Sequence, residues 1–129
     1  MTIELPWPPS VNDYYRRDPK TGARYLKNRG RQFRETVMML VRAQSCGPAP
    51  MLMGPLDFAM TVYPPDRRRH DSDNLLKAVQ DALEHAMVYD DDSQLARKFI
   101  ESCAPVEGGK VIVTVGKRGT VFPWEGVTR

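Results

Sequence analysis

Two segments of the chain repeat their apolar residues at the spacing of an α-helix. The first covers about residues 29–43 and the second about residues 71–86. The apolar positions are Phe33, Val37, Leu40 and Val41 in the first segment, and Leu76, Val79, Leu83 and Met87 in the second. Residues three or four apart lie on one side of a helix, so each segment would bury one face. The pattern predicts two amphipathic helices packed on one core.

Shorter segments around these helices have the alternating pattern of β-strands. They cover residues 3–5, 24–26, 55–63, 95–103 and 110–115. Gly108 and Gly109 stand between the last two and predict a turn that joins them as a hairpin. Strands and helices in this mixed order predict a small α+β domain, a single unit with a mixed sheet of short strands and two helices, over residues 1–118. Residues 119–129 are expected to form a loose C-terminal tail.

The composition is that of one ordinary globular domain. The 129 residues are 41% hydrophobic and 27% charged, which allows one core and argues against disorder. No apolar run approaches the roughly 20 residues that span a bilayer, and the N-terminus lacks the pattern of a secretory signal. Cys46 and Cys103 have neither a C-x-x-C partner nor a histidine cluster, which disfavours a zinc site or a disulfide framework. These features predict a cytoplasmic protein.

The charges are segregated along the chain. Residues 16–34 contain eight basic residues and one acid, and residues 67–69 are three consecutive arginines. Residues 71–107 contain nine acids and three basic residues. Like charges gathered in one place repel each other, so a basic segment favours a polyanionic partner and an acidic cluster favours a cation. The simpler alternative is a pair of solvated faces of opposite sign.

Asp71 and Asp73 lie two positions apart, where a loop is predicted to become a helix, and Asp90–Asp92 follow that helix. Mg²⁺ prefers carboxylate oxygens and is commonly held by a few of them. Lys77 shares a helix face with Asp73 and suits the stabilisation of phosphate charge. In the simpler interpretation, Asp71 or Ser72 caps the helix, Asp73 and Lys77 form a weak ion pair, and the later acids form a turn.

Arg67–Arg69 directly precede these acids. Cleavage of a polyanion requires two kinds of group side by side: acids that hold a metal ion, and basic groups that hold the phosphates. The sequence therefore favours a metal-dependent nuclease.

Three segments, taken in order, resemble the RusA-type Holliday junction resolvases of bacteria and their phages. They are LPWPPSVNDYY at residues 5–15, PDRRRHDSDNLLKA at residues 65–78, and DDSQ at residues 91–94. The resemblance implies a RusA-like homodimer that uses Mg²⁺, for which Mn²⁺ substitutes. It places Asp71, Asp73 and Asp92 on the metal-binding catalytic acids, with Asp91 as a neighbouring fourth ligand, and Lys77 on the catalytic lysine. His70 is a departure, because the family carries another arginine there, and a neutral imidazole binds phosphate more weakly.

The resemblance implies an endonuclease that resolves four-way DNA junctions by paired symmetric nicks, a task suited to a two-fold dimer. The expected DNA contacts are Arg67, Arg68, Arg69, His70, Arg16, Arg17, Lys27 and Arg29. Two alternatives stay open: a non-catalytic nucleic-acid-binding module, and a metal nuclease for other branched DNA. No membrane and no small-molecule cofactor are expected. Trp7 is expected to pack against the first helix, whereas Tyr14 either packs in the core or stacks on an unpaired base.

Overall fold

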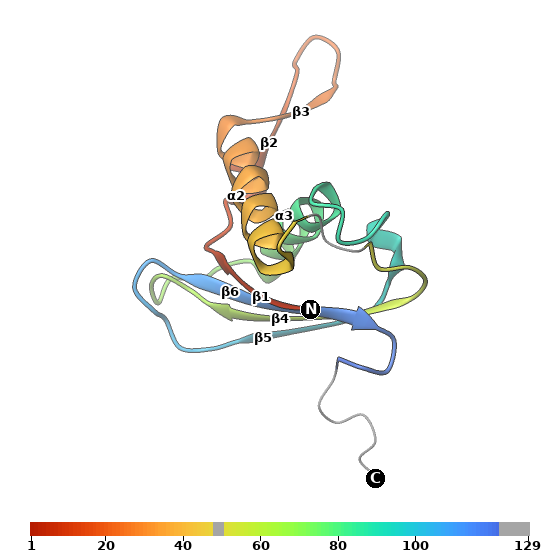
Figure 1. The fold of residues 1–129 in the computed structure, drawn as a ribbon. Coiled ribbons are helices and arrows are strands. Elements are labelled where there is room, and N and C mark those ends of the chain that lie inside the picture. Colours follow the sequence, from red (N-terminus) through yellow and green to blue (C-terminus); the bar gives the residue numbers. More distant parts are fainter. Residues whose placement is uncertain (48–50, 122–129) are drawn as a thin grey trace.

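The computed structural model describes residues 1–47 and 51–121 and places two long helices over one four-stranded sheet (Figure 1). Residues 48–50 and most of the predicted tail, from residue 122 on, lie outside the described residues. In chain order the elements are β1 (Thr2–Pro6), α1 (Val11–Tyr14), β2 (Tyr15–Arg17), β3 (Arg24–Leu26), α2 (Asn28–Ser45), β4 (Leu56–Tyr63), α3 (Ser72–His85), the 3-10 helix η1 (Asp92–Gln94), β5 (Leu95–Ser102) and β6 (Lys110–Lys117). The α+β class and both long helices are confirmed.

The sheet has the strand order β1-β6-β4-β5. Strands β4 and β5 run parallel, whereas β6 pairs antiparallel with both β1 and β4. The connection from β4 to β5 passes through α3, because a parallel pair needs a long crossover. Helix α3 therefore begins and ends at loops that connect it to strands of the sheet.

The predicted hairpin between the last two strands is wrong. Gly108 and Gly109 do turn the chain, with positive φ of 76° and 68°. The strands on either side of that turn are β5 and β6, and β4 lies between them. Alternate residues of β6 are buried, whereas most of β5 is exposed, so β6 occupies the centre of the sheet and β5 its edge. Alternation along one strand predicts its buried face but not its neighbours.

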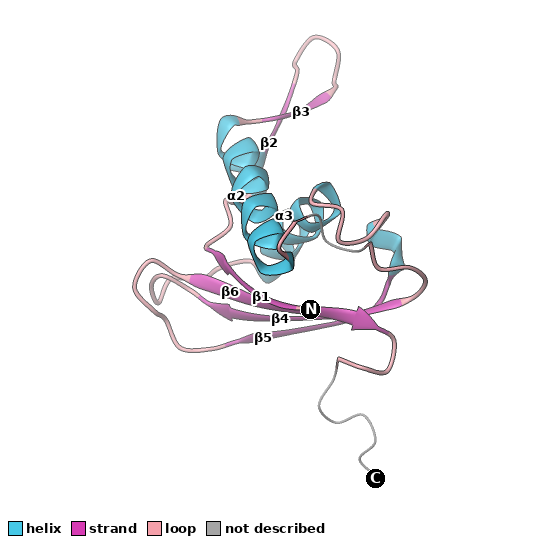
Figure 2. Ribbon diagram, in the orientation of Figure 1, coloured by secondary structure: helices cyan, strands magenta, loops and turns pink. Residues whose placement is uncertain are grey.

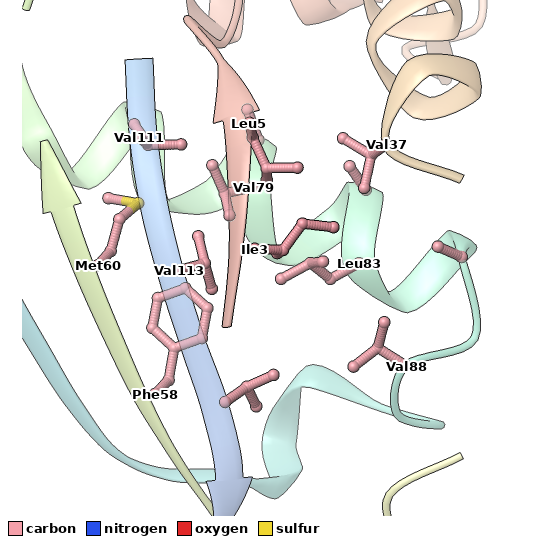
Figure 3. Close-up of a cluster of buried hydrophobic side chains, with 14 of the residues drawn as sticks. Ile3, Leu5, Val37, Phe58, Met60, Val79, Leu83, Val88, Val111 and Val113 are labelled. Carbon is pink, nitrogen blue, oxygen red and sulfur yellow. The ribbon is translucent and has the colours of Figure 1, made fainter. Parts of the chain in front are cut away.

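One face of the sheet forms the core with α2 and α3 (Figure 2). The strands supply buried residues that include Ile3, Leu5, Phe58, Met60, Val111 and Val113, and the helices supply Val37, Val79 and Leu83 (Figure 3). Met87 is the exception to the predicted helical stripe. Helix α3 ends before it, and Met87 takes a positive φ of 64° with 59% of its surface exposed. Within the described residues no helix combines the length and hydrophobicity needed to cross a membrane.

Strands β2 and β3 form a separate hairpin that projects from the body beside the start of α2 (Figure 1). The predicted strand at residues 24–26 is confirmed, but its partner β2 and the short helix α1 were not predicted. The base of the hairpin is held where the Lys27 N–H donates to the Tyr14 carbonyl at 2.9 Å. Gly30 permits this approach, because a Cβ there would lie 2.6 Å from the same carbonyl oxygen.

Candidate active site

The first turn of α3 carries Asp71 and Asp73. Asp71 is the N-cap residue, and its Oδ1 accepts a hydrogen bond from the Asp73 N–H at 3.0 Å. The capping role considered for Asp71 is therefore confirmed, and it uses one of the two carboxylate oxygens. Asp73 and Lys77 are both exposed, and within the described residues they form no ion pair with each other. Both carboxylates are thus accessible for binding a ligand.

The loop that leads into α3 presents the predicted arginines to solvent. Arg67, Arg68 and Arg69 are all exposed. Asp66 holds the loop in shape, since its Oδ1 accepts from the Arg68 N–H at 2.9 Å and lies 3.0 Å from His70 Nε2. The Arg68 N–H and His70 hold the pKa of the Asp66 carboxyl below its usual range.

His70 is half-buried and is engaged on two sides. One contact is with Asp66, and the other is with the Trp7 ring, whose centroid is 5.1 Å from the imidazole in an edge-to-face arrangement. Trp7 itself is partly buried and packs against the hydrophobic core. A hollow of about 610 Å³ is lined by Arg69, His70, Asp71 and Ser72. The basic loop and the first acid of α3 therefore border the same hollow.

A second acidic group lies at the other end of α3 and in the loop that follows it. Oxygens of Glu84, Asp91 and Asp92 lie within 4.8 Å of one another. Glu84 Oε1 also accepts the Asp92 N–H at 2.8 Å. The Ser93 N–H, which donates to Asp91 Oδ1, lowers the pKa of the Asp91 carboxyl. Asp91 and Asp92 were predicted, whereas Glu84 was missed, although it stands eleven positions after Asp73 and so returns to the same helix face.

Gln94 fixes the loop that carries these acids. Its Oε1 accepts the N–H groups of Asp90 at 2.9 Å and Asp91 at 3.0 Å. Its Nε2 donates to the carbonyls of Leu52 at 3.1 Å and Gly54 at 3.0 Å. All four hydrogen-bonding positions of the amide are therefore used. The D-x-x-Q spacing of Asp91 and Gln94 is that of a capping box, and this signal could have identified Gln94 from the sequence.

The structure separates the predicted acids into two groups. Asp73 and Glu84 are eleven residues apart on α3, which corresponds to about 16 Å along the helix axis. Among the described residues, the group of acids close enough to share an ion contains Glu84, Asp91 and Asp92, without Asp71 or Asp73. Asp71, Asp73 and Asp92 are therefore not brought together within one chain.

The predicted contacts in the basic segment lie around the β2–β3 hairpin. Arg16 and Arg17 are exposed on β2, and Lys27 and Arg29 are at the start of α2. Asp13 is 3.9 Å from Lys27 Nζ and 3.5 Å from Arg29 Nη1. The positive charge of this region is therefore partly compensated by Asp13.

Arg34, a member of the basic segment, has an internal role. Its guanidinium forms two hydrogen bonds to Asp81, at 2.7 and 2.8 Å, and Tyr14 donates its hydroxyl hydrogen to the same carboxylate. Burial raises the pKa of Asp81, but the bonds from Arg34 and Tyr14 outweigh it and lower the pKa overall. Burial, followed by the contact with Asp81, raises the pKa of Tyr14. Tyr14 is fully buried, so the core role is confirmed and the stacking role is wrong.

This site, with an exposed basic loop, accessible carboxylates and an acidic cluster on an α+β fold, has the features of a metal-dependent nuclease. The sequence profile described as "Endodeoxyribonuclease RusA" matches residues 6–116. The chain therefore belongs to the RusA family of endodeoxyribonucleases.

Individual relatives are similar in sequence to this chain along most of its length. The "Crossover junction endodeoxyribonuclease rusA" of Enterobacteria phage 82 is 33% identical over 117 residues, covering 91% of this chain and 94% of the relative. The proteins named "Crossover junction endodeoxyribonuclease RusA" from Escherichia coli K12 and Shigella sonnei Ss046 are each 33% identical over 118 residues, covering 92% of this chain and 95% of each relative. The family resemblance seen in the sequence is confirmed.

Proposed function

We propose that this protein is a Mg²⁺-dependent endonuclease that resolves four-way DNA junctions by paired symmetric nicks, acting in the cytoplasm of a bacterial cell. The observation that carries the proposal is the hollow where Arg69 and His70 meet Asp71, in a chain of the RusA family. The basic groups that line this hollow suit a DNA phosphate, and the carboxylate that lines it suits the metal that cleavage needs.

The acids fit a hard divalent cation. Asp71, Asp73, Asp91 and Asp92 are exposed carboxylates, the donor type that Mg²⁺ and Mn²⁺ prefer. We assign Asp71, Asp73 and Asp92 as the metal-binding catalytic residues, with Asp91 beside them. When bound, the ion polarises the phosphodiester and favours ionisation of a water molecule. Lys77, one turn after Asp73, stabilises the charge that develops on the attacked phosphate.

Because the acids are separated along α3, we propose that the protein acts as a homodimer. One chain keeps Asp71 and Asp73 about 16 Å along the helix axis from the group around Glu84. In a two-fold dimer, the pair from one chain can join Asp92 of the other, and symmetry then creates two identical sites. A four-way junction also has two-fold symmetry, so two such sites match two symmetric nicks.

We assign phosphate binding to the exposed basic residues. Arg67–Arg69 are adjacent to the hollow at Asp71 and hold the strand that is cut, whereas Arg16, Arg17, Lys27 and Arg29 hold DNA farther along. His70 is held by Asp66 and Trp7, so we assign it mainly to shaping the loop.

Replacement of Asp73 by Asn tests the catalytic assignment. We expect Asp73→Asn to abolish cleavage of a four-way junction while binding is kept or tightened, because one carboxylate that repels phosphate is removed. Gel-shift binding without metal and cleavage with Mg²⁺ measure the two properties. Glu101→Gln, which removes an exposed acid on β5, is the matched control and should cleave normally. Cleavage by Asp73→Asn at the normal rate would support a capping or surface role instead.

Mixed dimers test the sharing of ligands between chains. Asp73→Asn and Asp92→Asn are each expected to be inactive alone. If the site is shared, a mixed dimer contains one site with both changes and one intact site. An equal mixture of the two variants should therefore regain about a quarter of all the active sites. The two variants are coexpressed with different tags, and the mixed dimer is purified for single-nick assays. A mixed dimer as inactive as its parents would contradict a shared site.

A further inference from the structure

Two adjoining hollows lie along the start of α2, the first beside residues 7–10 and the second beside the β2–β3 hairpin. One has a volume of about 480 Å³ and includes Trp7 and Phe33 in its lining, and the other has a volume of about 460 Å³. Asp13 and Arg29 line both hollows. We call the second hollow, lined among others by Arg16, Tyr25, Lys27, Arg29 and Arg31, the hairpin groove.

Tyr25 presents an aromatic ring to this groove. It is 45% exposed and lies opposite Arg16 in the hairpin register, so both side chains are on the same face of the hairpin. The other tyrosines of this region are already engaged: Tyr14 is buried, and Arg24 covers the ring of Tyr15 at 4.5 Å. Within residues 1–47 and 51–121, Tyr25 has no aromatic or cation–π partner. Its ring is therefore accessible for stacking.

The charge around this ring is positive. Arg16, Lys27, Arg29 and Arg31 line the groove, and Asp13 is the acid among its lining residues. Asp13 is near Lys27 and Arg29, whereas the Arg31 guanidinium donates to a neutral group, Asn28 Oδ1, at 3.2 Å. An anionic ligand would therefore find excess positive charge next to an accessible aromatic face, the combination that holds single-stranded nucleic acid.

The groove is connected to the candidate active site through a chain of contacts. The first hollow shares Asp13 and Arg29 with the groove and reaches Trp7. The Trp7 ring contacts His70, which lines the hollow at Asp71. A DNA strand bound at Asp71 could therefore continue past Trp7 to Tyr25.

We propose that the hairpin groove binds an unstacked nucleotide of the junction, with the base against Tyr25 and neighbouring phosphates on Arg16 and Arg31. The inference rests on the proposed function, since it names a subsite for the same substrate. It gives the projecting hairpin a role in selecting branched over continuous DNA, because the bases of an intact duplex remain stacked on one another and cannot offer a free face to Tyr25.

A binding experiment with the full chain tests this subsite. The ligands are a synthetic four-way junction carrying 2-aminopurine at the branch point and a linear duplex of the same length, both in EDTA so that no cleavage occurs. Tyr25→Ala should weaken junction binding by about 5- to 150-fold, the range for loss of one stacked base. It should leave duplex binding unchanged and abolish the change in 2-aminopurine fluorescence. Tyr25→Phe, which keeps the ring, should behave as the wild type.

Phe99→Ala is the matched control, because Phe99 is 40% exposed but lies on β5, away from the hairpin. It should bind both ligands normally. Arg31→Gln should reduce the salt dependence of junction binding by about one released counterion. The proposed subsite would be contradicted if Tyr25→Ala matched the wild type both in junction affinity and in the change in 2-aminopurine fluorescence. It would also be contradicted if Tyr25→Ala lost junction and duplex affinity equally. A wild-type protein that neither prefers nor cuts the junction would instead overturn the proposed function.

Discussion

Gln94 shows how a single side chain can define the position of a loop that carries several acids. Its amide contacts four backbone groups and ties the loop of Asp90 and Asp91 to residues 52–54. The acids themselves repel one another, so a neutral side chain that holds their backbone keeps them in place without adding charge. Residues that orient metal ligands in this way affect metal affinity although they do not touch the ion.

Gln94→Glu is therefore expected to weaken metal binding. The new carboxylate has no N–H to donate to the carbonyls of Leu52 and Gly54, so the loop that carries the acids loses two of its anchors. The negative charge that it adds would by itself attract a cation, so a fall in affinity reports the lost hydrogen bonds. We expect the Mn²⁺ affinity measured by calorimetry to fall by about 10- to 100-fold. Gln32→Glu, which makes the same charge change at an exposed position on α2, should bind Mn²⁺ normally. Equal affinities of the two variants would show that Gln94 does not position the ligands.

Asp57 gives a second prediction at this scale, on stability. It is fully buried, and it accepts hydrogen bonds from Arg97 at 2.8 and 2.5 Å and from the Gly119 N–H at 2.7 Å. The hydrogen bonds from Arg97 lower its pKa more than burial raises it. A lowered folded-state pKa means that the unfolded chain binds the proton more tightly. The stabilisation is therefore present above the unfolded pKa of about 3.9 and is lost as the pH falls below it.

Arg97→Ala should destabilise the protein at pH 7 by about 3–5 kcal/mol, because it leaves the Asp57 carboxylate buried without its partner. Denaturant unfolding at several pH values measures this. The loss should shrink towards acid pH, where Asp57 becomes protonated in the variant. Lys98→Ala, at the exposed neighbouring position, is the control. A loss that stayed constant from pH 7 to pH 3 would show that the interaction is not ionic.

At the scale of elements, α3 positions the acids of the candidate site. Its first turn carries Asp71 and Asp73, and Glu84 near its end holds the backbone of Asp92. The local part of this arrangement was predictable, because the helix pattern at residues 71–86 and the D-x-D spacing are properties of neighbouring residues. The contact between Glu84 and Asp92 depends on how the chain turns after α3. Likewise, the position of β6 between β1 and β4 depends on which strands compete for the centre of the sheet.

Two substitutions at Asp71 separate its capping role, which the structure shows, from the catalytic role that we propose for it. Asp71→Asn keeps the cap of α3 and removes the charge, so it should unfold like the wild type but fail to cleave. Asp71→Ala loses the cap as well and should be destabilised by about 1 kcal/mol. Denaturant unfolding and junction cleavage measure the two effects. Normal cleavage by Asp71→Asn would show that Asp71 is a cap and not a ligand.

At the scale of the whole molecule, the match to the RusA family over residues 6–116 covers both long helices, the hairpin, and strands β4, β5 and nearly all of β6, whereas all but the last residue of β1 precedes it. The family could be recognised from three short motifs, since each is a local run of residues. The distribution of the acids between the two ends of α3 could not be predicted from these motifs, because it follows from the packed fold. That distribution is the physical reason to expect two chains at each metal site.

The most direct test of the central claim is a map of the nicks on a mobile four-way junction. Each strand is end-labelled in turn and incubated with the wild-type protein, with Mg²⁺ or with EDTA, alongside a fork and a linear duplex. We predict paired nicks at symmetric positions in two opposite strands, in the presence of Mg²⁺ and on the junction in preference to the other substrates. Salt-sensitive binding to the junction with no Mg²⁺-dependent nick in any strand would contradict the account.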